Sequence, residues 1–132
     1  MDAEAVRGLC LSFPGAYEDY PFGPEIAVYK VRSPASAGSA VEGKMFAAMR
    51  ADAEPLSISL KCEPALAIQL RAVHPEITGA WHMNKKHWNS VRLDGDLGDE
   101  AVRDMVEDSY DLVVASLPRR QREALGWAGL AR

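Results

Sequence analysis

The stretch Leu56-Ser57-Ile58-Ser59-Leu60-Lys61 decides the fold. Leucine and isoleucine alternate here with serine and lysine, and this period of two predicts a strand with one buried face and one solvated face. The next residues are Cys62-Glu63-Pro64, and a proline can take the first position of a helix without losing a backbone hydrogen bond. We therefore predict a sheet that helices cover on one face only.

The segments on either side extend this pattern. Short apolar or β-branched runs predict further strands, at residues 26–31, 44–49 and 90–93, and residues 33–43 predict an exposed loop. Helical spacing of apolar residues predicts helices that begin after Asp2, at Pro64 and after Gly98, and a further short helix through Leu125. These elements together predict an α+β fold in which helices pack on one face of an antiparallel β-sheet.

Two predicted helices carry a defined core stripe. On the helix that starts at Pro64, the apolar residues at helical spacing are Leu66, Leu70 and Val73. On the last long helix the predicted buried face comprises Val102, Met105, Val106, Ser109, Leu112, Val113 and Ser116.

A length of 132 residues predicts one domain, with a core over about residues 2–117 and a basic tail over 118–132. The formal net charge is -4, but residues 94–111 alone carry -7, which leaves +3 over the rest of the chain. A local basic surface is therefore compatible with the acidic total. We interpret the acidic segment as the solvated face of a helix.

Cysteine usage and the N-terminal sequence predict a compartment. Cys10 and Cys62 are far apart and lack CxxC spacing, which favours a reducing cytoplasm. The first residues have neither a basic region nor an apolar run typical of a signal peptide, and no stretch of about 20 apolar residues is present. We expect a soluble cytoplasmic protein without a membrane partner.

The sequence offers little for catalysis or metal binding. Its histidines and cysteines lack the close pairs of zinc sites, so we predict no metal and no cofactor. Cys10 lies on an apolar stripe, where burial raises a thiol pKa. Cys62 follows Lys61 and precedes a helix, two features that lower a thiol pKa, but no general base accompanies it. We predict that the protein is not an enzyme.

A basic and aromatic run between residues 77 and 93 contains no acidic residue. Cations can bind phosphates, and aromatic rings can stack on bases. Amides, here those of Asn84 and Asn89, can form hydrogen bonds with base edges. This composition is therefore typical of a nucleic-acid surface. If the strands are neighbours, Trp88, Ser90 and Arg92 share a face with Ser57, Ser59 and Lys61. The predicted nucleic-acid-binding residues are Lys61, His82, Asn84, Lys85, Lys86, His87, Trp88 and Arg92.

Several runs together resemble the MmcQ/YjbR family of small bacterial proteins. They are Asp19-Tyr20-Pro21-Phe22-Gly23-Pro24, Lys44-Met45-Phe46-Ala47, Leu60-Lys61-Cys62-Glu63-Pro64, His82-Met83-Asn84-Lys85-Lys86-His87-Trp88-Asn89 and Ser109-Tyr110-Asp111-Leu112-Val113. The resemblance implies a fold similar to the frataxin-like CyaY arrangement and DNA binding by two hairpin loops that act as a double wing. The corresponding wing here, residues 33–43, is longer than is usual and contains no lysine or arginine.

Three hypotheses follow for function. The first is a non-enzymatic DNA-binding protein that contacts phosphates through the basic and aromatic run. The second is a small-molecule or protein-binding module in which the same run and residues 19–22 line a pocket. The third, by analogy to frataxin, is binding of iron or of a basic partner by the acidic last helix.

Overall fold

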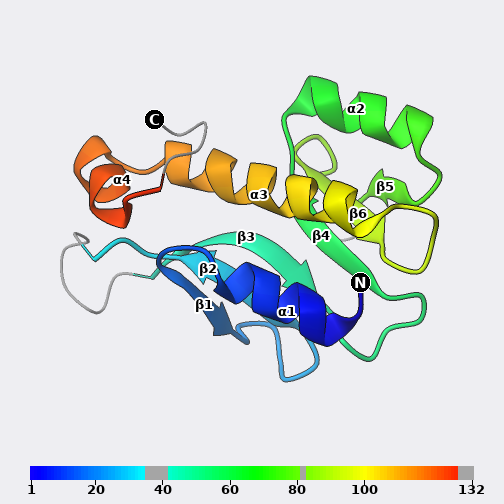
Figure 1. The fold of residues 1–132 in the computed structure, drawn as a ribbon, viewed down its shortest axis with the longest axis horizontal. Coiled ribbons are helices and arrows are strands. Elements are labelled where there is room, and N and C mark those ends of the chain that lie inside the picture. Colours follow the sequence, from blue (N-terminus) through cyan, green and yellow to red (C-terminus); the bar gives the residue numbers. More distant parts are fainter. Residues whose placement is uncertain (35–41, 81–82, 128–132) are drawn as a thin grey trace.

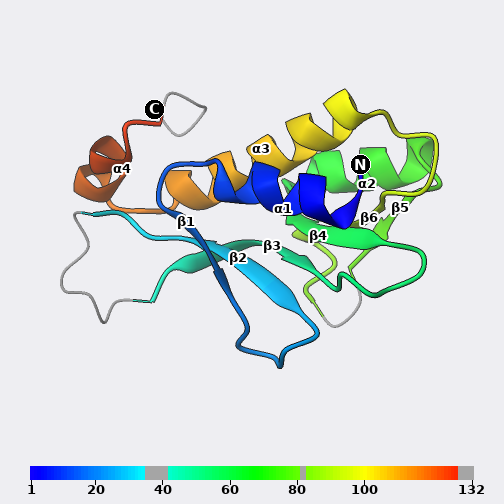
Figure 2. The ribbon, with the colours of Figure 1, turned by 60° about the horizontal axis from the view of Figure 1, so that its bottom comes forward.

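The computed structural model describes residues 1–34, 42–80 and 83–127, and these form a sheet with helices on one face. Figure 2 shows the two layers from the side, with the helices above the sheet and its other face uncovered. The predicted α+β fold is therefore confirmed (Figure 1). The strands are β1 (Ala16–Asp19), β2 (Ala27–Val31), β3 (Lys44–Met49), β4 (Ser57–Lys61), β5 (Ile77–Gly79) and β6 (Trp88–Arg92). The helices are α1 (Ala3–Leu11), α2 (Pro64–Val73), α3 (Asp99–Ala115) and α4 (Arg119–Leu125).

The six-stranded sheet has the order β1-β2-β3-β4-β6-β5, and every neighbouring pair is antiparallel. In the β4–β6 pair, Lys61 lies opposite Trp88 and Ser59 lies opposite Ser90. Directly opposed residues share a face of the sheet, so the predicted grouping of these side chains on one face is confirmed.

Local sequence signals fix the helix starts. The Asp2 carboxylate accepts a hydrogen bond from the Ala5 amide at 2.8 Å and caps α1. Pro64 occupies the first turn of α2, and Gly98 is the N-cap of α3, as predicted. The short helix predicted through Leu125 is α4, which ends at Gly126 in the left-handed conformation.

The core lies between the helices and the sheet and contains an aromatic cluster under α3. The rings of Phe13 and Tyr110 stack with centroids 4.7 Å apart, and Phe46 and Trp127 pack edge-on against Tyr110. Because Leu125 is buried and Trp127 is half-buried, the segment after residue 118 contributes to the core. The described part of the basic tail is a packed element of the domain.

The α2 stripe prediction is wrong in part. Val73 is 70% exposed and Leu66 is 37% exposed, whereas Ala67 is the residue of α2 that is buried. Figure 1 shows α2 at the end of the helix layer, over the β5 and β6 side of the sheet. Since a neighbouring element covers this helix on one side only, spacing along the sequence overestimated its buried surface.

The buried face of α3 is shifted relative to the prediction. Ser116 is exposed, whereas Tyr110, Asp111 and Val114 are buried in addition to the predicted valines. Trp127 accounts for Asp111, because its indole N–H donates to that carboxylate on a side of the helix that the sequence pattern leaves to solvent. Tyr110 is buried because its ring packs against Phe13 and Phe46. The edge strands β1 and β5 were also not predicted, because their short sequences lack an alternating pattern.

Candidate binding surfaces on the two faces of the sheet

The uncovered face of the sheet holds a groove of about 680 Å³, which we call the open-face groove. Its floor comes from β3, β4 and β6, and its walls come from the β1–β2, β3–β4 and β5–β6 connections. The wall and floor residues are Phe22, Ile26, Met45, Ala48, Met49, Arg50, Ala53, Pro55, Ser57, Ser59, Met83, Asn84 and Trp88. Apolar and aromatic side chains with a few hydroxyls and amides are the usual lining of a ligand site.

The described turn before β6 places one predicted binding residue, Asn84, in the lining of this groove. The Asn84 carbonyl accepts from the amides of His87 and Trp88, at 3.0 and 2.9 Å, and its side-chain oxygen accepts from the Lys86 amide at 3.0 Å. Arg71 of α2 donates to the Lys85 carbonyl at 2.7 Å. The turn is thus held by its own backbone, by the Asn84 side chain and by Arg71, and Lys85 and Lys86 are exposed on it.

Cations on the open side of the sheet are unequally compensated. Arg92 contacts both carboxylate oxygens of Asp94, at 3.0 and 3.2 Å, and this hydrogen-bonded pair raises the pKa of the guanidinium. Lys30 is buried between Asp19 and Glu42. By contrast, Lys61 and Lys86 have no ion-pair partner among the residues that the structure describes. The effective positive charge therefore lies around Trp88 rather than at Arg92.

The structure brings together three of the predicted binding residues on the open face. Asn84 and Trp88 line the open-face groove, and Lys61 lies opposite Trp88 on the same face. The side chain of Lys85 instead lies against Gly79, which is paired with Asn89 and shares its helix-covered face, and Lys86 is exposed on the turn. Of the others, Arg92 is paired with Asp94, His87 uses its carbonyl to accept from the Cys62 amide at 2.8 Å, and His82 lies outside the described residues. Most of the 33–43 loop, residues 35–41, also lies outside them.

Asn89 is the clearest difference from the sequence interpretation, which placed its amide with the base-reading groups. It lies on the helix-covered face, is 2% exposed, and neither its side-chain oxygen nor its nitrogen has a hydrogen-bond partner within the described parts of the chain. Strand alternation explains this placement, because Trp88 points to the open face. An unsatisfied buried amide costs about 1–3 kcal/mol, so Asn89 requires an explanation.

The two thiols differ from each other in environment. Burial raises the pKa of Cys10 to about 12, in agreement with the prediction for a thiol on an apolar stripe. The predicted lowering at Cys62 is wrong: burial raises the pKa of Cys62, and the charges of Asp108 and Glu63 raise it further. Desolvation, followed by the charges of the nearby carboxylates, outweighs the lowering effects of Arg71 and of the Glu63 backbone hydrogen bond.

The described residues form neither a metal-binding cluster nor a membrane-spanning helix. Within residues 1–34, 42–80 and 83–127, no three histidine, cysteine or carboxylate side chains lie close enough together to hold a metal ion. In the same ranges, every helix is too short or too polar to cross a bilayer.

Comparison with known proteins identifies the family. A model of the YjbR family matches residues 11–112. The Uncharacterized protein YbdF of Escherichia coli O157:H7 is 32% identical over 120 residues, which cover 91% of this chain and 90% of that protein. The Uncharacterized protein YjbR of Escherichia coli K12 is 38% identical over 85 residues, which cover 64% of this chain and 72% of that protein. The chain belongs to the YjbR family, and the resemblance in its motifs is confirmed.

Solved structures agree with this fold. The Deinococcus radiodurans protein DR2400, which has the DUF419 domain, superposes with a TM-score of 0.84 at 32% identity, covering 96% of this chain and 89% of that chain. A Pseudomonas syringae protein superposes with a TM-score of 0.68 at 27% identity, and the superposition covers 86% of this chain and 99% of that chain. None of these names states a ligand or an activity, so function has to be argued from the surfaces described above.

Proposed function

We propose that this YjbR-family protein is a non-enzymatic DNA-binding protein that holds unpaired bases in the open-face groove. The observation that carries the proposal is the pairing of Lys61 with Trp88 across β4 and β6, which sets a cation beside an aromatic ring that lines the groove. Stacking on an aromatic ring with phosphates held by nearby cations is the common mode of single-strand recognition.

The geometry favours single strands over duplexes. Trp88 and Phe22 line a concave surface, and a base must leave its stack before its ring can enter such a surface. Because Arg92 and Arg50 are each paired with an aspartate, the cations available to phosphates are few. Duplex binding that depends on many phosphate contacts is therefore less favoured than binding in which stacking supplies about 1–3 kcal/mol per base.

Fluorescence anisotropy with a labelled oligo-dT strand tests the proposal at low salt, with the corresponding duplex alongside. We expect tighter binding of the single strand and an affinity that falls as salt rises. Trp88→Ala should weaken binding about tenfold or more, since this variant has no ring on which a base can stack. Absence of binding, or an affinity independent of salt, would contradict the proposal.

A matched pair of double variants separates local from general charge. Lys61→Ala with Lys86→Ala should weaken binding for all sequences and reduce the salt slope by about 0.7 for each phosphate that these lysines neutralise. Arg103→Ala with Arg120→Ala removes the same charge from exposed positions on α3 and α4 and should leave affinity nearly unchanged. Equal weakening by both pairs would show attraction to net charge instead of a site.

A second candidate function is binding of a small apolar molecule in the same groove. The observation that favours it is the methionine content of the lining, Met45, Met49 and Met83, because methionine adapts its shape to apolar ligands. Indole is a suitable probe, with the methionine methyl signals followed by NMR. Saturable shifts from indole that do not depend on salt, together with no oligo-dT binding, would favour this function over the first.

A further inference from the structure

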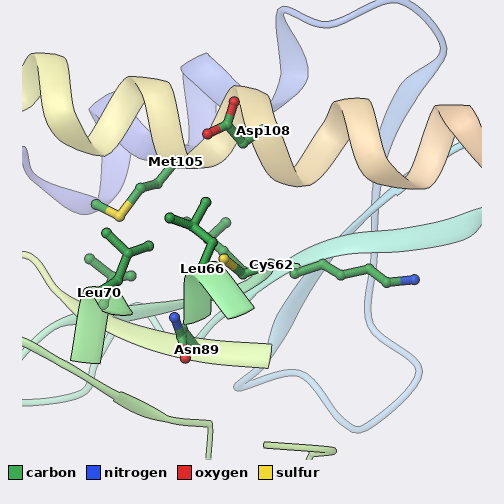
Figure 3. A pocket seen from close by; sticks show the side chains of 9 residues that line it. Cys62, Leu66, Leu70, Asn89, Met105 and Asp108 are labelled. Atoms are coloured by element: carbon green, nitrogen blue, oxygen red, sulfur yellow. The ribbon is translucent and has the colours of Figure 1, made fainter. Parts of the chain in front are cut away.

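The helix-covered side of the sheet holds a second cavity, between α2, α3 and strands β4 and β6. It has a volume of about 20 Å³ and is lined by Leu60, Lys61, Cys62, Leu66, Leu70, Asn89, Val91, Met105 and Asp108 (Figure 3). A larger pocket of about 320 Å³ adjoins it and shares Cys62, Leu66 and Asp108 with it. Together they form a cleft, the α2–α3 cleft, that ends at Asn89.

Asn89 is the polar end of this cleft. Figure 3 shows its amide nitrogen directed toward Leu66 and Leu70 and its oxygen directed away from them. Neither amide atom has a partner among the described residues, although the side chain is almost fully buried. Because no hydrogen bond holds the amide in one orientation, it can present either its oxygen or its nitrogen to a group in the cavity. A partner for this amide has to come from the cavity.

The size and walls of the cleft limit that partner. About 20 Å³ accommodates a single water-sized group, such as an amino or hydroxyl group. The side chains of Leu66, Leu70 and Met105 make the surrounding walls apolar. The larger pocket, lined also by Leu112 and Ala115, can accept a short aliphatic chain attached to that group.

The charges at the cleft select the sign of the ligand. Asp108 lines both parts, and Glu63 and Asp111 line the outer part. Desolvation, followed by the charges of Asp111 and Asp104, raises the pKa of Asp108. The cation in the inner lining is Lys61, a strand residue that shares the open face with Trp88. A carboxylate ligand would be repelled, whereas an ammonium group would be attracted.

We propose that the α2–α3 cleft is a second binding site, distinct from the open-face groove, that takes a small primary alkylamine. Its ammonium group donates to the Asn89 side-chain oxygen and lies near the Asp108 carboxylate, and its alkyl chain contacts Leu66 and Leu112. Entry requires a small displacement of α2. This helix buries only Ala67 among its residues, and its Leu66, Ile68 and Val73 side chains are exposed.

Butylamine, 1-butanol and butyrate are matched probes of this site, with methyl signals of Leu66, Leu70 and Met105 followed by NMR at neutral pH. We expect saturable shifts with butylammonium, weaker shifts with 1-butanol and none with butyrate. Equal responses to butylamine and butyrate would overturn the charge selection. Absence of a saturable response to butylamine would overturn the proposal.

Variants assign the site to individual groups. Asn89→Leu keeps the number and branching of the side-chain heavy atoms but removes the amide, and it should weaken butylammonium binding about tenfold or more. Asp108→Asn should weaken binding of butylammonium but not of 1-butanol. Glu107→Gln removes the same charge from an exposed neighbouring position on α3 and should change neither. Binding of butylammonium that survives Asn89→Leu would contradict the assignment.

Two controls keep the interpretation independent of folding and of the proposed DNA site. Asn89→Leu should retain the methyl spectrum of the folded core and its affinity for oligo-dT, because Asn89 faces away from the open-face groove. A long-lived water that shows an NOE to the Asn89 amide, and that butylamine does not displace, would mean that the cavity holds structural water only. That result would overturn the proposal.

Discussion

Trp88 and Asn89 are neighbours in the sequence, but they serve opposite faces of the same sheet. Trp88 lines a groove that no helix covers, whereas Asn89 is buried beneath α2 and α3. The same division runs along β4, where Ile58 and Leu60 are buried and Ser57 and Ser59 are half-buried. The helix-covered face of the sheet therefore supplies stability, while the open face remains available for a ligand. Two neighbouring residues of one strand, Trp88 and Asn89, contribute to different faces.

The largest effect should come from the covered face. Ile58→Ala removes methyl groups from a fully buried side chain and should lower the free energy of unfolding by about 2–5 kcal/mol. Ser59→Ala, one residue further along β4 but on the open face, should change it by no more than about 0.5 kcal/mol. Denaturant unfolding of both variants measures this difference. Similar losses for both would contradict the assignment of the two faces.

A smaller loss should follow from the contact that closes the helix layer. Trp127→Phe keeps a ring in the aromatic cluster but removes the N–H that donates to the buried Asp111 carboxylate. An unpaired buried acceptor should cost about 1–3 kcal/mol of unfolding free energy. Adding Asp111→Leu to Trp127→Phe should recover part of the loss, which a double-mutant cycle measures. No recovery would mean that the indole acts through packing alone.

Thiol reactivity sharpens the comparison between the interior and the cleft. Cys10 is fully buried with its pKa raised to about 12, whereas Cys62 is half-exposed with a smaller rise. A disulfide reagent at mildly alkaline pH should therefore label Cys62 at least about tenfold faster than Cys10. Labelling of a Cys62→Ala variant should proceed only as fast as the core opens. Rapid labelling of that variant would contradict the packing of α1.

The smallest effect concerns the acidic wall of the α2–α3 cleft. The folded state raises the pKa of Asp108, so it binds more protons than the unfolded state, and stability falls as pH rises above the ordinary carboxyl pKa of about 3.9. Asp108→Asn should raise the free energy of unfolding at neutral pH, and with it the melting temperature. The gain should be less than about 1 kcal/mol, because solvent screens this exposed residue. The gain should vanish below about pH 4. A gain that persists in acid would show that charge is not its cause.

Much of the fold follows from local sequence. The alternation in residues 56–61 predicted a strand with two unlike faces, and the caps at Asp2, Pro64 and Gly98 predicted where helices begin. These signals are reliable because they depend on residues close in the chain. Three of the predicted binding residues, Lys61, Asn84 and Trp88, also come together, since they belong to one turn and to two paired strands.

Contacts between distant segments were not predictable in the same way. The Trp127 indole donates to the Asp111 carboxylate, Val73 is exposed at the end of the helix layer, and the charge of Asp108 on α3 helps to raise the pKa of Cys62. Each outcome depends on what lies across the sheet or beside the helix. Periodicity alone identifies an apolar face, but it does not show whether another element covers it.

The sequence by itself determined the α+β class, the family and the chemical character of the run before β6. Only the tertiary structure decided that Trp88 and Lys61 meet at a groove while Asn89 ends a cleft on the other side. The physical reason is that a strand sends successive side chains to opposite faces, and packing of helices on one face alone determines which of them reach solvent.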